Sequence, residues 1–356
     1  MITHLRLQNF RSYKNAVFEL GPGVNIVVGP NASGKTNLLE AVLVAARGSS
    51  YRAKDSELVC FGSDWARLDV ETADGKRVVK LQSRGAEKVT KTFEIDEQPL
   101  ARLTPARMLP AVLFEPNHLL LFSGSPDLRR SFLDDLLEQT RPGFSATRRH
   151  YKRVLTQRNA LLKNNPHNLH EQLFAWNIRL GELGGQIVRE RVNLIKHFAE
   201  RASDLYGKLA GKDHAIELSY RTGFDPDNYE TALIHKLESS VDLDVARGFT
   251  AYGPHRDDLA VHIDGHPVQD AASRGETRTM VLALKIMELQ LLEELSGKRP
   301  LLLLDDVFSE LDSTRRHLLT KFLEDHQTFI TTTDADVVAG HFAASTVIVP
   351  TSRSVA

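Results

Sequence analysis

The sequence is short of cysteine, since Cys60 is the only one among 356 residues. A single cysteine excludes an internal disulfide and any zinc site built from several thiolates. The sequence has no uncharged apolar run of about 18 residues or more, so a membrane-spanning helix is not expected. The first ten residues also lack the apolar stretch of a secretory signal. We therefore expect a cytoplasmic protein that makes no contact with a membrane.

The chain also lacks an excess of basic charge. Lysine and arginine number 45 against 46 aspartates and glutamates, and the net charge is -1. A protein that coats nucleic acid through its overall charge would instead be strongly basic. Any contact with nucleic acid must therefore come from a local basic surface, from the geometry of a dimer or from a partner.

Short strands separated by turns are predicted in the first third of the chain, and a helical middle follows from about residue 126. The last third alternates helix and strand again. This order predicts an α/β domain assembled from both ends of the chain, with a helical insertion. We expect residues 1–125 and 245–356 to form the domain, and residues 126–244 to form the insertion.

Within the insertion, apolar residues recur at alternating spacings of four and three, as in a heptad repeat. They are Leu169, Leu173, Trp176, Leu180, Leu183 and Ile187 and, after a slip, Ile195, Phe198, Ala202, Leu205 and Leu209. One helix over this stretch would be roughly 60 Å long at about 1.5 Å per residue, although Gly181, Gly184 and Gly185 weaken its middle. We expect Ala146 to Leu162 to pack against it as a short antiparallel arm. Two ordinary amphipathic core helices would show the same spacing.

The strongest motif is Gly29-Pro30-Asn31-Ala32-Ser33-Gly34-Lys35-Thr36, which fits G-x-x-x-x-G-K-[ST] between an apolar strand and a helix. The two glycines permit a tight wrap, so that backbone N–H groups and the positive end of the helix face one anion. Lys35 can bridge the β- and γ-phosphates of ATP, and the Thr36 hydroxyl can bind Mg²⁺. The motif predicts an ATP site.

Two carboxylates, Asp305 and Asp306, follow the apolar run Leu301 to Leu304. An acid at the carboxyl end of a buried strand is how these ATPases present the metal-binding group. We expect Asp305 in the Mg²⁺ shell and Asp306 beside the attacking water; the alternative is a helix cap or a loop acid. Asp306 is one methylene shorter than the usual glutamate, so we predict slow hydrolysis, below about 1 s⁻¹.

Two shorter sequence elements indicate which class of ATPase the chain resembles. Ser273-Arg274-Gly275 precedes a predicted helix, and Ser309-Glu310-Leu311-Asp312 follows the acidic strand. In ABC and SMC ATPases, a Ser/Gly element at a helix start donates to the γ-phosphate of ATP held by a second subunit. We expect Ser273, Arg274 and Gly275 in that role, and Asp312 at the dimer seam. Either element alone would pass for a helix cap, but their order and spacing favour an ABC/SMC-like head.

Five strings carry a resemblance to the RecF family of DNA replication and repair proteins, which covers nearly the whole chain. They are Leu7 to Tyr13, Gly29 to Glu40, Gly124 to Asp134, Tyr252 to Leu259 and Asp305 to Asp312. The resemblance implies an SMC-like ATPase head that closes into a homodimer around ATP. It also implies binding to double-stranded DNA near single-strand gaps, partnership with RecR and RecO, and a role in recombinational repair and damage signalling.

The chain departs from the family pattern at four places. Ala32 replaces a glycine, which we expect to be tolerated if its φ is negative. Glu276 replaces a glutamine, which either weakens dimer closure or is accepted by the helix start. Residues 115–118 lack the usual acidic pair, so we assign no metal contact there. Thr333-Asp334 replaces a His-Asp pair, and Thr333 can orient the attacking water but cannot carry a proton.

A basic stripe is predicted on one helix, because Arg148 and Lys152, and likewise Arg149 and Arg153, are four residues apart. It lies within residues 141–163, which hold seven Lys or Arg and no acid. Such a stripe suits contacts to DNA phosphates. A solvated helix face is the alternative.

Two further signals stay open. Arg11 can face the nucleotide or lie on the surface. The turn from His255 to Asp258 can be a site or an ion-paired brace.

Three other functions are alternatives to that of a RecF-like repair ATPase. A transporter ATPase is disfavoured because residues 37–272 far exceed the interval between these motifs in that class. A chromosome-organising SMC protein is disfavoured because no coiled coil of hundreds of residues is present. An ATP-gated scaffold with incidental hydrolysis stays open.

Overall fold

The structure is a computed structural model that describes residues 1–84, 89–323, 325–333 and 347–350. It divides into two compact units, of which the first comprises Met1–His118 and Lys285–Ala356 and the second Leu119–Leu284. The first unit therefore joins both ends of the chain. The domain boundaries expected at residues 126 and 244 stay a prediction, since this division runs through the middle of one helix, α9 (Arg274–Ser296).

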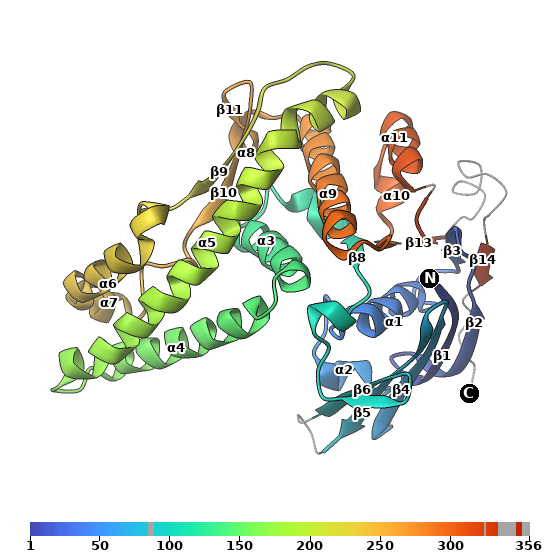
Figure 1. Cartoon of the computed structure of the whole chain (residues 1–356), viewed down its shortest axis with the longest axis horizontal. Coiled ribbons are helices and arrows are strands. Elements are labelled where there is room, and N and C mark those ends of the chain that lie inside the picture. Colours follow the sequence, from blue (N-terminus) through green and yellow to red (C-terminus); the bar gives the residue numbers. More distant parts are fainter. Residues whose placement is uncertain (85–88, 324, 334–346, 351–356) are drawn as a thin grey trace. The chain divides into compact units, whose positions relative to one another are not determined.

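A six-stranded antiparallel sheet in the order β2-β1-β4-β5-β6-β7 forms one layer of the first unit (Figure 1). Its strands are β1 (Ile2–Phe10), β2 (Tyr13–Glu19), β4 (Trp65–Thr72), β5 (Gly75–Ser83), β6 (Val89–Ile95) and β7 (Gln98–Leu100). Asp74-Gly75 turns the chain between β4 and β5, where Gly75 has a φ of 141° that favours glycine. This layer is built entirely from the first 100 residues.

The second layer of the first unit is a five-stranded parallel sheet in the order β14-β3-β13-β12-β8. Its strands are β3 (Val24–Val28), β8 (Ala111–Phe114), β12 (Leu301–Leu304), β13 (Thr328–Thr332) and β14 (Val347–Pro350). All residues of β8, β12 and β13 are buried, as expected for a parallel sheet. Strands from both ends of the chain are neighbours within it, since β3 lies between β14 and β13 and β8 lies beside β12.

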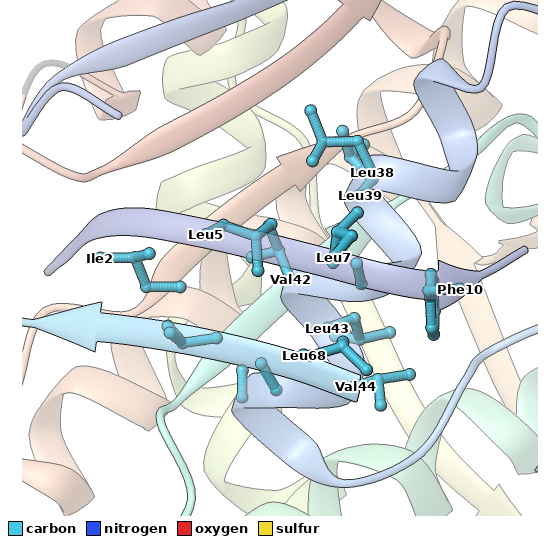
Figure 2. Close-up of a cluster of buried hydrophobic side chains, with 14 of the residues drawn as sticks. Ile2, Leu5, Leu7, Phe10, Leu38, Leu39, Val42, Leu43, Val44 and Leu68 are labelled. Carbon is cyan, nitrogen blue, oxygen red and sulfur yellow. The ribbon is translucent and has the colours of Figure 1, made fainter. Parts of the chain in front are cut away.

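Helix α1 (Lys35–Arg47) contacts strands of both sheets and is buried nearly all round. Leu38, Leu39, Val42 and Leu43 share one apolar cluster with side chains of β1 and β4, as Figure 2 shows. A helix that is apolar on most sides must be enclosed, and only Thr36 and Asn37 at its start and Arg47 at its end are partly exposed. The loop before α1 is therefore held by the packing of the whole unit.

Several short elements lie in the segments between these strands. They are the helices α2 (Asp55–Leu58), α10 (Val307–Glu310) and α11 (Ser313–Leu323) and the 3₁₀ turns Pro105–Arg107 and Pro116–Leu120. Among the described residues, none of the helices combines the length and the apolarity needed to cross a bilayer.

The second unit is mainly helical, with a small antiparallel sheet in the order β11-β10-β9. Its helices are α3 (Pro126–Thr140), α4 (Phe144–Asn164), α5 (Leu169–Ala210), α6 (Tyr229–Ser239), α7 (Val241–Arg247), α8 (Val268–Ala271) and the start of α9, with a 3₁₀ turn at Pro226–Asn228. Its strands are β9 (Ile216–Arg221), β10 (Asp258–Ile263) and β11 (His266–Pro267).

The predicted heptad stretch is one continuous helix, α5, of 42 residues. All of the predicted apolar positions except Trp176 are buried, and α4 runs beside α5 after a short turn (Figure 1). The expected pairing of two antiparallel helices is confirmed.

The glycines in the middle of α5 have a packing role that the sequence did not reveal. A Cβ added at Gly181 would lie 2.4 Å from Cγ1 of Ile234 on α6, and one at Gly184 would lie 3.1 Å from Leu233. Glycine thus lets α6 lie close against α5, and this packing offsets the low helix propensity of the residue.

A set of buried ion pairs joins two of the strings quoted above for the family resemblance. The Arg129 guanidinium donates to both oxygens of Asp258, at 2.7 and 2.8 Å. Arg191 donates to both oxygens of Asp134, at 2.8 and 2.9 Å, and to the carbonyl of Pro254 at 2.7 Å. The turn at residues 255–258 is therefore braced by ion pairs and buried hydrogen bonds, in agreement with the second of its two interpretations.

Arg158, which the sequence placed in the basic segment, is completely buried. It donates to Asp244 at 2.7 Å, to Asn177 at 2.8 Å and to Thr250 at 2.8 Å. Both side chains of the Arg158–Asp244 pair have no exposed surface. Arg158 is thus a structural residue and cannot contact DNA.

We predict that Asp244→Ala destabilises the protein by about 3–5 kcal/mol, because it leaves the buried Arg158 charge without its partner. Urea unfolding followed by circular dichroism measures the change. Glu182→Ala is the control, since it breaks an exposed pair with Arg179 and should cost no more than about 0.5 kcal/mol. Equal losses in the two variants would contradict this account of Arg158.

Candidate functional site

The parallel sheet brings the predicted site residues of the first unit to one edge. Val28 pairs with Thr332, and Leu304 pairs with both Ile330 and Phe114, so the carboxyl ends of four strands lie within two residues of one another. The residues that follow these strands are Gly29, Thr333, Asp305 and Glu115. Ligands of open α/β sheets bind at this edge.

The phosphate loop leaves β3 at Gly29 and enters α1 at Lys35. Gly34 has a φ of 105°, and a Cβ there would lie 2.9 Å from the Tyr13 hydroxyl, which donates to the Gly34 carbonyl. The Lys35 ammonium donates to the loop carbonyls of Gly29 at 2.7 Å and Pro30 at 3.1 Å. The loop therefore wraps around its own lysine, with the positive end of a 13-residue helix behind it.

The side chains of the other loop residues differ in exposure. Pro30, Asn31 and Ala32 are exposed, while Ser33 is buried and its backbone N–H donates to the Pro30 carbonyl at 3.2 Å.

Ala32 was expected to be tolerated in the loop if its backbone φ is negative, and the structure differs from this condition. Its φ is 63°, in the left-handed region that favours glycine. An L-residue with a Cβ is strained there, by roughly 1–2 kcal/mol. The condition of a negative φ is therefore not met, and the loop carries this strain at the position where the family usually has glycine.

Asp305 is the centre of a cluster of hydroxyl groups. Its Oδ1 accepts from the Thr36 hydroxyl at 3.0 Å and from the Thr331 hydroxyl at 2.9 Å. Its Oδ2 accepts from the Tyr51 hydroxyl at 2.8 Å. The carboxylate is 7% exposed. The two residues predicted to bind Mg²⁺, Thr36 and Asp305, are thus brought together across 269 positions of sequence.

Asp306 lies next to this cluster but differs from Asp305 in both backbone and exposure. Its φ is 56°, its side chain is exposed, and its backbone N–H donates to the Thr331 hydroxyl at 2.8 Å. The left-handed turn directs the chain from β12 into α10. Thr333 is exposed at the end of β13, and Asp334 lies outside the described residues.

Three residues near Asp305 were not predicted from the sequence. Tyr51 and Thr331 donate to its carboxylate, as given above. Glu115 follows β8, and burial together with the neighbouring Asp305 raises the pKa of its carboxyl. Glu115 could have been found by the rule that found Asp305, because it directly follows an apolar run; Tyr51 has no such signal.

Tyr51 keeps its proton at neutral pH. Burial, followed by the negative charge of Asp305, raises the pKa of the phenol above its ordinary value. The hydroxyl can therefore act as a hydrogen-bond donor to Asp305.

Ser273, Arg274 and Gly275 lie at the start of α9, in the second unit. The Ser273 N–H donates to Glu276 Oε2 at 2.8 Å, and the Glu276 N–H donates to Ser273 Oγ at 3.2 Å. This reciprocal pair is a capping box. The Ser273 N–H and hydroxyl hold the pKa of Glu276 below its ordinary value. Of the two outcomes expected for Glu276, the helix start accepts it.

Asp312 precedes α11 and is exposed. Its Oδ1 accepts from the Arg315 N–H at 2.9 Å, and its other oxygen pairs with the Arg315 guanidinium. Asp312 therefore caps a helix within its own chain.

Arg11 is held against α1 by a buried carboxylate. Its guanidinium donates to both oxygens of Glu40, at 2.7 and 2.9 Å, and Glu40 has no exposed surface. Arg11, Ser12 and Asn37 also line a cavity of about 860 Å³. Arg11 thus lies near the start of α1. This position is intermediate between the two that were predicted, one facing the nucleotide and the other on the surface.

The predicted basic stripe on α4 is only partly available. Arg148 pairs with Asp134 at 3.1 Å and with Glu138 at 2.9 Å. Arg149, Lys152 and Arg153 are exposed. Within the predicted stripe, the residues that can contact a phosphate backbone are therefore Arg149, Lys152 and Arg153.

The RecF/RecN/SMC N terminal domain family matches this chain over residues 1–352. The DNA replication and repair protein RecF of Acetivibrio thermocellus is 35% identical over 348 residues, which cover 94% of each chain. The protein of the same name from Roseiflexus castenholzii is 36% identical over 369 residues, which also cover 94% of each chain.

Solved structures share the fold. The recombination mediator protein RecF-ATPrS of the RecFOR pathway has a TM-score of 0.85 at 30% identity and covers 95% of this chain and 94% of its own. RecF-ATP of the same pathway has a TM-score of 0.81 at 30% identity, with 94% and 92% covered. An Smc head bound to the C-winged helix domain of ScpA is similar in fold alone. Its TM-score is 0.51 at 15% identity, and the match covers 95% of this chain and 91% of that chain. The predicted ABC/SMC-like fold is confirmed.

We predict that Ala32→Gly stabilises the protein by up to about 1 kcal/mol, because it removes the Cβ from a left-handed position. Thermal unfolding without nucleotide measures the effect. The same substitution at Ala175, exposed within α5, should instead cost about 1 kcal/mol, since glycine is a poor helix former. A loss of stability in both variants would show that Ala32 is not strained.

Proposed function

The chain belongs to the RecF family, within the wider RecF/RecN/SMC group, and on that premise we propose that it is an ATP-dependent DNA-binding protein of recombinational repair. In this proposal it binds double-stranded DNA near single-strand gaps and helps to load a recombinase with RecR and RecO. The names of its relatives support the role, since they are called replication and repair proteins and recombination mediators of the RecFOR pathway.

The observation that carries the proposal is the contact between Thr36 and Asp305, 3.0 Å apart at the edge of the parallel sheet. A hydroxyl and a carboxylate are the oxygen donors that Mg²⁺ prefers beside nucleotide phosphates, so the residues present fit this ion. We assign Gly29 to Thr36 to the phosphates of ATP and Thr36 with Asp305 to Mg²⁺. When bound, the ion would offset the negative charge of the phosphates.

Lys35 has a defined part in this site. Its ammonium is directed at the loop carbonyls of Gly29 and Pro30, and it can exchange these for the β- and γ-phosphate oxygens. That exchange is favourable because phosphate carries a full charge whereas a carbonyl carries a dipole.

We propose that ATP joins two copies of the chain. In the dimer, Ser273, Arg274 and Gly275 of one copy would meet the γ-phosphate held by the other, and Asp312 would lie at the seam. The exposure of Ser273, Arg274 and Asp312 supports this arrangement, as does the helix start behind them, which favours an anion. The capping box at Ser273 would hold the helix start in one conformation before contact.

Hydrolysis in this proposal is slow. Asp306 would orient the attacking water with help from Thr333, and both are exposed at the ends of adjacent strands. Neither matches the usual groups, since Asp306 has a shorter reach than glutamate and Thr333 cannot accept a proton as histidine does. This favours, as the alternative function, a scaffold in which ATP gates DNA binding and hydrolysis is incidental.

We predict that Lys35→Ala weakens ATP binding by roughly 10- to 100-fold, since a hydrogen bond to a charged group contributes about 1.5–3 kcal/mol. It should also abolish ATP-dependent dimerisation in sedimentation velocity runs with and without gapped duplex. Asp306→Asn should keep the ATP-dependent dimer but lower hydrolysis at least about 100-fold. Dimers that persist unchanged in Lys35→Ala would refute the shared site.

We predict that replacing Arg149, Lys152 and Arg153 together by glutamine weakens DNA binding and flattens its salt dependence. Each lost phosphate contact reduces the slope of log affinity against log salt by about 0.9, so three contacts reduce it by about 2.7. Fluorescence anisotropy with gapped duplex at several salt concentrations measures the slope.

The control for this experiment removes the same charge elsewhere in the second unit. Arg179, Lys208 and Lys212 are exposed, and their joint replacement by glutamine should leave the slope unchanged. Equal slopes for the two triple variants would show that α4 does not contact DNA.

A further inference from the structure

We propose that Tyr51 is a positioning residue of the nucleotide site, whose phenol fixes the Asp305 carboxylate for its part in binding Mg²⁺ with ATP. This inference rests on the proposed function and concerns the same site. It adds a residue from outside the sequence motifs, since Tyr51 lies in the segment between α1 and α2.

The ring of Tyr51 is held on more than one side. It is half-buried and packs against the apolar core of the first unit. The Arg52 guanidinium lies 5.8 Å from the centre of the ring and itself donates to Asn37 on α1 at 2.7 Å. The phenol is therefore placed by packing, and its hydrogen bond of 2.8 Å to Asp305 Oδ2 is directed by the fold.

The acceptor positions of Asp305 show what this bond does. An ionised carboxylate has about four of them, two on each oxygen. Thr36 and Thr331 fill those of Oδ1, and Tyr51 fills one on Oδ2. Among the residues that the structure describes, no second donor meets Oδ2, so one position there is open to a water of the metal shell or to the metal.

Without the phenol, Oδ2 has two open positions and only Oδ1 is anchored. The carboxylate then gains freedom to turn about its bond to Cβ, and the ordering that Tyr51 supplies in advance must be supplied by the metal. Groups that orient metal ligands in this way typically change metal affinity 10- to 100-fold, roughly, when they are removed.

The test is Tyr51→Phe, which keeps the ring and its packing and removes only the hydroxyl. Binding of a fluorescent ATP analogue is titrated with Mg²⁺ and, separately, measured in excess EDTA. The Mg²⁺ concentration at half effect should rise about tenfold, while the affinity in EDTA stays that of the wild type. The thermal midpoint should change little.

Tyr220→Phe is the matched control, because it removes the hydroxyl of another half-buried tyrosine that donates to a carboxylate, that of Asp257, at 3.0 Å. It should lower the thermal midpoint and leave the Mg²⁺ titration unchanged. If the Tyr51→Phe titration coincides with that of the wild type, or if its affinity falls equally in Mg²⁺ and in EDTA, the positioning role is wrong while the nucleotide site stands. If the wild type itself binds no nucleotide, the proposed function fails and this inference fails with it.

Discussion

The enclosure of α1 between two sheets is the constraint on which the rest of the first unit depends. Its residues from Leu38 to Ala46 are all buried, so the helix cannot shift along its axis without opening the core. Even its glutamate, Glu40, is enclosed, and the charge is matched by the guanidinium of Arg11. Because the phosphate loop ends where this helix begins, the core fixes the position of the loop.

The same core determines the chemistry beside the loop. Asp305 is almost completely buried, and three neutral hydroxyls hold its charge without cancelling it. Because the donors are neutral hydroxyls, they orient the carboxylate and place no positive charge beside it.

Much of this could be predicted from the sequence, because the signals were periodic or positional. The apolar runs before Gly29 and Asp305 predicted strands, and the spacing of leucines predicted the helical stretch that forms α5. What could not be predicted depends on contacts between distant segments. Arg158 shares the buried stripe of α4 with Val154 and Leu162, whereas Arg153 lies off it, but nothing in the sequence shows that Asp244, 86 positions away, is the partner that Arg158 binds. The left-handed φ of Ala32 likewise follows from the closure of the loop and not from the residue.

The strand order of the parallel sheet has a consequence for how the protein is made. Strand β3, complete at residue 28, has β13 and β14 as its two neighbours, both more than 290 residues later in the chain. Contacts of such sequence separation form late in folding. On the ribosome, β3 must therefore wait without its partners until residues 328–350 have been made, and a chain that terminates before them would expose this apolar strand to chaperones and proteases.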